Sequence, residues 1–140
     1  MSLVLQREAI VTRALNNWVR TEYGDLFLDN FSGPTPPGGQ FTELTILTGL
    51  RRQEGIGGPG QACLRTRSIL QFSVYSPQNV GVDNLDKTCD FIHGLFIKWE
   101  QLLLDGDKVS FQVPYTLNRG KGSGRYTRVV SCPFYLEEHI

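Results

Sequence analysis

The sequence has 140 residues, of which 40% are hydrophobic and 11% are aromatic. A chain of this length and composition forms one domain with a core of its own, which argues against wholesale disorder. Fourteen basic residues balance fourteen acidic ones, so the zero formal net charge gives no overall attraction to nucleic acid. No apolar run approaches the ~20 residues that span a bilayer.

The first predicted element is a helix over residues 2–23. Its apolar side consists of Leu3, Ile10, Val11, Ala14, Leu15 and Trp18. Gly24 follows at the position where a C-terminal cap is expected. A short strand over 26–31 comes next, and the Gly/Pro-rich stretch 32–39 is predicted to be an irregular loop.

Two further strands are predicted on either side of a glycine-rich segment. Residues 41–47 alternate between apolar and polar side chains, and so do residues 68–75, as in strands with one buried face. The segment 49–61 between them contains five glycines and one proline, which exclude a stable helix. We therefore expect a hairpin whose connection, an arm loop over 49–61, projects from the body of the protein.

The central helix is predicted from a long apolar stripe. Its members recur at spacings of 4, 3, 4, 3 and 4 and are Leu85, Cys89, Ile92, Phe96, Trp99 and Leu103. Asp83 is a suitable N-cap, so the helix is expected to run over 83–103. A strand over 109–113, a basic glycine-rich hairpin tip over 118–124 and a last strand over 125–136 complete the chain.

These elements follow one another in the order α-β-β-β-α-β-β. They predict an α+β two-layer sandwich, in which a mixed or antiparallel β-sheet of about five strands packs on two helices. The sequence shows no internal repeat and no linker, so residues 1–140 are expected to form a single domain.

The chain offers few candidates for catalysis or for binding a metal or cofactor. Cys89 and His93 are four residues apart on the predicted helix and could touch, but a core cysteine beside a flanking histidine is the simpler interpretation. The glycines of 55–60 precede a strand, whereas a phosphate-binding loop precedes a helix N-terminus. No Cys or His spacing is typical of a metal site. We expect no cofactor and no enzymatic activity.

The cysteines and the N-terminus predict the compartment. Cys63, Cys89 and Cys132 are odd in number and far apart, and we interpret them as small core hydrophobes. The N-terminus lacks the basic start and the long apolar core of a signal peptide. A reducing compartment, such as a cytosol, is therefore expected.

Charge is unevenly distributed along the chain. Residues 51–80 hold four arginines against one glutamate, and residues 119–136 hold four basic residues and no acidic one. Residues 81–118, mostly the central helix, hold three basic residues against six acidic ones. Three hypotheses remain open for the basic hairpins: contact with another protein through complementary charge, contact with DNA phosphates or a small ligand, or no role beyond solvation.

The sequence also resembles the small bacteriophage tail-completion proteins of the tail-terminator type, the lambda-type minor tail proteins, and their prophage-encoded relatives of unknown function. Trp18 in the opening helix and Leu-Thr-Ile-Leu at 44–47 before a glycine-rich arm carry part of the resemblance. The strand over 68–77, with Ser68 at the position of the family's glycine, carries most of the rest. Gly81 and the aromatic end of the following helix complete it.

The resemblance implies an α+β protein that forms a ring, commonly of six subunits, at the end of the phage tail tube. Such a ring halts tube polymerisation and presents a face to the head-completion or neck proteins, while nucleic acid is met only as passing genome DNA. It implies a place in the virion after assembly in the host cytoplasm, and it allows a monomer for the isolated protein. By position, the residues expected to contact neighbouring subunits or partners are Arg51, Arg52, Gln53, Glu54, Arg119 and Lys121.

Overall fold

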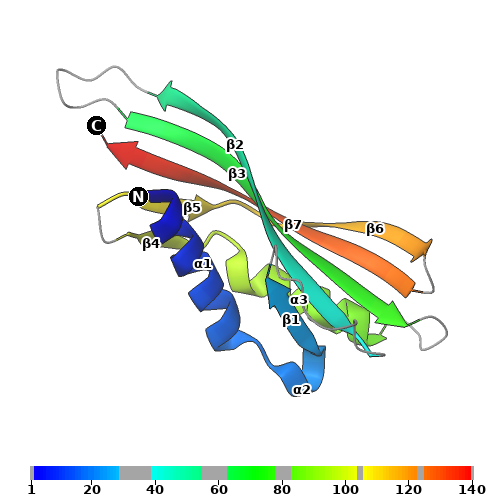
Figure 1. The fold of residues 1–140 in the computed structure, drawn as a ribbon. Helices are drawn as coiled ribbons and strands as arrows, with labels where there is room; N and C mark the ends of the chain where they lie inside the picture. Colours follow the sequence, from blue (N-terminus) through cyan, green and yellow to red (C-terminus); the bar gives the residue numbers. More distant parts are fainter. Residues whose placement is uncertain are drawn as a thin grey trace.

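Figure 1 shows the computed structural model, which describes residues 2–28, 39–54, 63–77, 83–103, 106–122 and 125–139. At residues 2, 50–54, 63, 119–122 and 139 it describes the path of the backbone only. Its elements in chain order are α1 (Ser2–Asn17), α2 (Arg20–Tyr23), β1 (Asp25–Leu28), β2 (Phe41–Glu54), β3 (Cys63–Pro77), α3 (Asp83–Phe96), β4 (Glu100–Leu102), β5 (Lys108–Phe111), β6 (Tyr115–Gly122) and β7 (Arg125–His139).

One curled mixed sheet forms the centre of the fold. Its strand order is β1-β2-β3-β7-β5-β4, and β6 pairs with β7 beside that path. Only the β1–β2 pair is parallel among these pairings. The long strands β2, β3 and β7 twist across the whole molecule, and α1 and α3 lie on the same side of them (Figure 1).

The expected mixed α+β class is confirmed, but the expected number and order of elements are wrong. Across the described ranges the sheet has seven strands rather than about five, and three helices accompany it rather than two. The additional strands β4 and β6 are short or glycine-rich, so their sequences lack the apolar alternation that identifies a half-buried strand.

The core lies between the helices and the inner face of the sheet. Leu70, Phe72 and Val74 of β3 are completely buried, which confirms the alternation expected there. Phe72 pairs with Leu44 on one side and with Val130 on the other, so three strands contribute to the same layer. Helix α1 covers this layer with Ile10 and Ala14, both completely buried.

The first helix is shorter than expected and is interrupted after Asn17. The backbone of Trp18 is not helical. The Nε1 atom of its indole donates a hydrogen bond to the carbonyl oxygen of Gly24 at 2.8 Å. The short α2 then ends at Gly24, whose φ of 81° is easily reached by glycine. The cap at Gly24 is therefore confirmed, but it closes a second helix and not the first.

The central helix also ends early, at Phe96 instead of Leu103. Lys98 adopts a positive φ of 50°, and its amide donates to the Gln112 carbonyl oxygen at 3.2 Å. Residues 100–102 pair with β5 as strand β4. The stripe expected for a longer helix continues across this turn, because Trp99 remains packed against the core and Leu103 is only 7% exposed.

The glycine-rich segments contain more strand than the sequence predicted. Strand β2 continues to Glu54 and pairs with β3 up to Cys63, so residues 49–54 belong to a ladder and not to a loop. Likewise, most of the expected tip over 118–124 belongs to β6. The rest of the arm over 55–61, residues 123–124 and most of the loop expected over 32–39 lie outside the described residues.

A β-bulge marks the point where the arm begins. Thr48 pairs with Ser68, but the next pair is Arg51 with Thr66, so β2 has one extra residue opposite Arg67. Gly49 lies in this bulge, close against the backbone of Arg67.

Candidate interaction surface

The outer face of the sheet, opposite the helices, carries a trough of about 690 Å³. Apolar, aromatic and polar residues line it, with two arginines among them. The side chains that define this outer trough are Leu47, Ile69, Tyr115, Pro133, Tyr135, Arg65 and Arg67. Tyr115 is 45% exposed and Leu47 is 47% exposed, so large apolar groups face solvent here.

Strand register brings the trough together from four strands. Ile69 of β3 pairs with Leu47 of β2 and with Pro133 of β7, which places three apolar residues in one row across the sheet. One row further along, Arg67 pairs with Tyr135. Tyr115 is contributed by β6. These residues occupy the alternate positions of β3 and β7, the ones that the core does not use.

The two arginines of the trough have different partners. Arg65 makes an ion pair with Glu137, with 2.9 Å between Nη2 and Oε1, and its guanidinium lies 4.8 Å from the centre of the Tyr135 ring. Arg67 is exposed and lies 5.6 Å from the centre of the same ring. No ion pair within the described ranges involves Arg67. Its charge is therefore available to an incoming carboxylate.

The structure separates the two groups of residues that the sequence singled out. On the arm, Arg51, Arg52, Gln53 and Glu54 pair with residues 63–66 of β3. In β6, Lys121 pairs with Tyr126 near the start of β7, and Arg119 lies at a register shift between Asn118 and Gly120. The arm lies beside the other end of β7, around Glu137, roughly 35 Å further along at ~3.3 Å per residue. The two groups therefore lie at opposite ends of the sheet (Figure 1).

Part of the basic charge expected on the hairpins is used within the chain. Arg128 of β7 makes an ion pair with Asp86 of α3, so it joins the sheet to the helix. The Arg125 guanidinium lies 4.8 Å from the centre of the Phe41 ring. The acidic helix therefore already has a basic partner in its own chain, which the sum of charges along the sequence did not reveal.

The cysteine and histidine of the central helix do not form a nucleophile and base. Cys89 is 4% exposed, and burial, followed by the nearby Asp90, raises the pKa of its thiol to about 11. The Nε2 atom of His93 instead lies 2.6 Å from Oγ1 of Thr116 in β6. Burial likewise raises the pKa of the Cys132 thiol to about 12. Both thiols are poor nucleophiles at neutral pH.

The described part of the chain contains no candidate metal site. Within those ranges there is no group of three or more His, Cys, Asp or Glu residues that could hold a metal ion. Nor is any helix there long and apolar enough to cross a bilayer.

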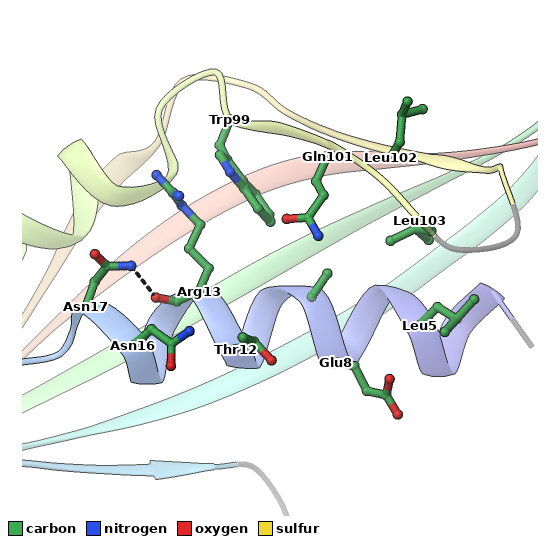
Figure 2. A pocket seen from close by; sticks show the side chains of 11 residues that line it. Leu5, Glu8, Thr12, Arg13, Asn16, Asn17, Trp99, Gln101, Leu102 and Leu103 are labelled. Atoms are coloured by element: carbon green, nitrogen blue, oxygen red, sulfur yellow. Dashed lines mark hydrogen bonds between the residues drawn. The ribbon is translucent and has the colours of Figure 1, made fainter.

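A second hollow, of about 390 Å³, lies between α1 and β4 (Figure 2). Arg13 reaches across it toward the turn that holds Trp99, and its guanidinium lies 4.8 Å from the centre of the indole. Its Nε donates to the carbonyl oxygen of Leu95 at 2.7 Å. Because the last carbonyls of a helix lack partners within the helix, Arg13 serves as a C-terminal cap for α3.

Arg13 is partly buried, and the resulting desolvation lowers the pKa of its guanidinium. The main cation of the second hollow is thus committed to holding α1 against the end of α3. Between the two hollows, the outer trough is the better candidate for binding a partner.

Comparison with known proteins supports the fold and does not extend to function. No protein-family model matches the sequence, and no curated protein is significantly similar to it. The structure is similar to a solved structure that carries only a serial designation, with a TM-score of 0.71 and 17% sequence identity. The similarity covers 97% of this chain and 96% of the other. It shows that the whole chain adopts a fold already seen in a solved protein.

The residues of the outer trough were missed by the sequence analysis. The patterns in the sequence indicate the positions that alternate into the core, such as Leu70 and Phe72, and the charged hairpin tips. The intervening positions of β3 and β7 are mostly polar or charged, and Ile69, Pro133 and Tyr135 are isolated apolar or aromatic residues among them. No periodic signal in either strand marks these residues, because strand register alone brings them into one row.

Proposed function

We propose that the protein is a structural tail protein of a phage or prophage. It caps the tail tube as a ring of its own copies, ends the polymerisation of the tube and forms part of the head–tail joining interface. Its partners are other copies of itself, the tail-tube protein and the head-completion or neck proteins, and its final location is the virion. The identification as a tail terminator rests on the sequence resemblance.

The observation that carries the assembly part of the proposal is the outer trough. Exposed aromatic and apolar side chains with arginines among them are typical of protein–protein interfaces, where Tyr and Arg are enriched. The two buried thiols offer no reactive nucleophile. The outer trough therefore favours a partner protein over a small substrate.

Tail length tests the proposed role. In a phage or induced prophage that carries this gene, deletion is expected to give tails of uncontrolled, excessive length that fail to join heads. Electron micrographs measure both features, and complementation with the intact gene is the control. Tails of unchanged length and normal joining in the deletion strain would refute the proposal.

Binding of DNA through the basic hairpins is the alternative outcome. It predicts an affinity for duplex DNA that falls steeply with salt and falls again when Arg51, Arg52, Arg119 and Lys121 are changed to alanine. These positions lie at opposite ends of the sheet, so a duplex would have to lie along its length to meet both groups. Strong DNA affinity of this kind, without ring formation, would replace the assembly role.

A further inference from the structure

Helix α1 presents a second apolar surface, which points away from the core. Gln6, Ile10 and Ala14 are buried at spacings of four, whereas Val4 is 55% exposed and Leu15 is 49% exposed. Val4, Glu8, Val11 and Leu15 follow one another at spacings of 4, 3 and 4, so they form one stripe along the helix. We call these four residues the α1 stripe. Its only charged member is the exposed Glu8.

We propose that the α1 stripe of one copy docks into the outer trough of the next copy. The inference rests on the ring assembly proposed above and names the two surfaces that form it. Helix α1 covers the inner face of the sheet and the trough lies on the outer face, so the two surfaces cannot meet within one chain. They can meet between copies arranged head to tail, the arrangement that closes into a ring.

The dimensions of the two surfaces agree. From Val4 to Leu15 the stripe is about 16 Å long at ~1.5 Å per residue. Along β3 the trough runs from Arg65 to Ile69, about 13 Å at ~3.3 Å per residue. Across the sheet it extends over three strand spacings, from β2 to β6, or about 14 Å. The trough is therefore wide enough to receive one face of a helix about 10 Å in diameter, with the stripe extending a few ångströms beyond it.

Charge complementarity selects α1 over the other exposed elements. Glu8, in the middle of an otherwise apolar stripe, would meet Arg67, whereas the other arginine of the trough, Arg65, is already paired with Glu137. The exposed side of α3 is mostly charged or polar, and its Asp86 is already paired with Arg128. Strand β4 offers one exposed leucine, Leu102, on a strand of only three residues.

A charge swap tests the pairing. Assembly of the purified protein is measured by sedimentation velocity alone and by electron microscopy on tail tubes, for wild type, Glu8→Arg, Arg67→Glu and the double variant. Each single variant is expected to need about tenfold more protein to assemble, because it places two like charges together. The double variant restores opposite charges at every interface and is expected to recover. Lys87→Glu, on the exposed side of α3, is the matched control and should assemble like wild type.

The apolar part of the interface has its own test. Leu15→Ser is expected to weaken assembly about tenfold, since the largest apolar side chain of the stripe is removed from the contact. Leu102→Ser changes a leucine that is even more exposed, at 71%, and should have no effect. All these positions are exposed, so melting temperatures should stay within about 2 °C of wild type, which separates loss of assembly from loss of folding.

The outcomes distinguish the two proposals. Wild-type rings that form equally well with both single charge variants and with Leu15→Ser would overturn the α1–trough interface and leave the ring proposal intact. Equal weakening by Leu102→Ser would also overturn it, because the docking surface would then lie at β4. A wild-type protein that forms no ring, with or without tail tubes, would overturn both proposals.

Discussion

Substitution of Gly49 by alanine is expected to damage the junction between the body of the sheet and its arm. A Cβ at this position would lie 2.1 Å from the carbonyl oxygen of Arg67 and 3.2 Å from its carbonyl carbon. Both atoms belong to the backbone of the neighbouring strand, so no rotation of a side chain can relieve the overlap. The added carbon and the oxygen have to reach at least 3.4 Å before their contact is an ordinary one.

The cost follows from the displacement that this requires. Overpacking a site that cannot relax costs about 1–3 kcal/mol, and here the bulge itself has to shift against β3. At about 2–4 °C per kcal/mol, the melting temperature should fall by several degrees. The loss should be largest for the backbone amides of the arm, residues 49–54 and 63–67, because the displaced oxygen lies in that part of the ladder.

Urea unfolding and amide hydrogen exchange measure these two effects. Gly94→Ala is the matched control, since a Cβ there meets nothing within 4 Å and the position lies in α3. Alanine in a helix interior should stabilise the protein by about 0.5–1 kcal/mol relative to glycine. A Gly49→Ala protein that loses less than about 0.5 kcal/mol and exchanges like wild type along the arm would show that the bulge is misplaced.

Two further predictions concern the core and the helix cap. Arg13→Lys should cost about 1–2 kcal/mol in urea unfolding, because lysine lacks the planar fork that lies over Trp99 while donating to Leu95; a cost near zero would show that the cap contributes nothing. Cys89, with its thiol pKa raised from 9.0 to about 11, should make the folded protein less stable as pH rises through that window, because the unfolded thiol ionises first. The fall in unfolding free energy between those pH values should be smaller in Cys89→Ala, and an unchanged fall would contradict the burial of this thiol.

The end of the central helix shows where sequence periodicity was insufficient. Trp99 and Leu103 continue the apolar spacing of α3, so the pattern gave no reason to stop at Phe96. What ends the helix is tertiary: Arg13 from α1 caps the Leu95 carbonyl oxygen, and the amide of Phe111 in β5 donates to the Trp99 carbonyl oxygen at 2.8 Å. Both partners come from distant parts of the chain, which a local pattern does not contain.

The same distinction applies to the first helix and to the arm. Leu15 was grouped with the core because it is apolar and lies near Ala14, yet it is half exposed and belongs to the α1 stripe. Gly49 indicated irregular backbone, and at this residue the irregularity proved to be a bulge within a strand that continues to Glu54. In contrast, Leu70, Phe72 and Val74 were placed correctly, because strict alternation specifies the buried face of a strand directly.

The sequence could not predict the candidate surface as a whole. Tyr115 and Tyr135 lie twenty residues apart and come together only because β6 pairs with β7, the strand that contains Tyr135. Sums of charge over sequence segments do not indicate which residues pair, so they could not predict the ion pairs Arg128–Asp86 and Arg65–Glu137. Register between distant strands decides both features.

Electron microscopy of purified tail tubes incubated with the protein tests the central claim most directly. We expect a ring of copies at one end of each tube, with no further growth of the capped end when tube protein is added. Tubes that keep growing from both ends, with the protein remaining monomeric in solution, would contradict it.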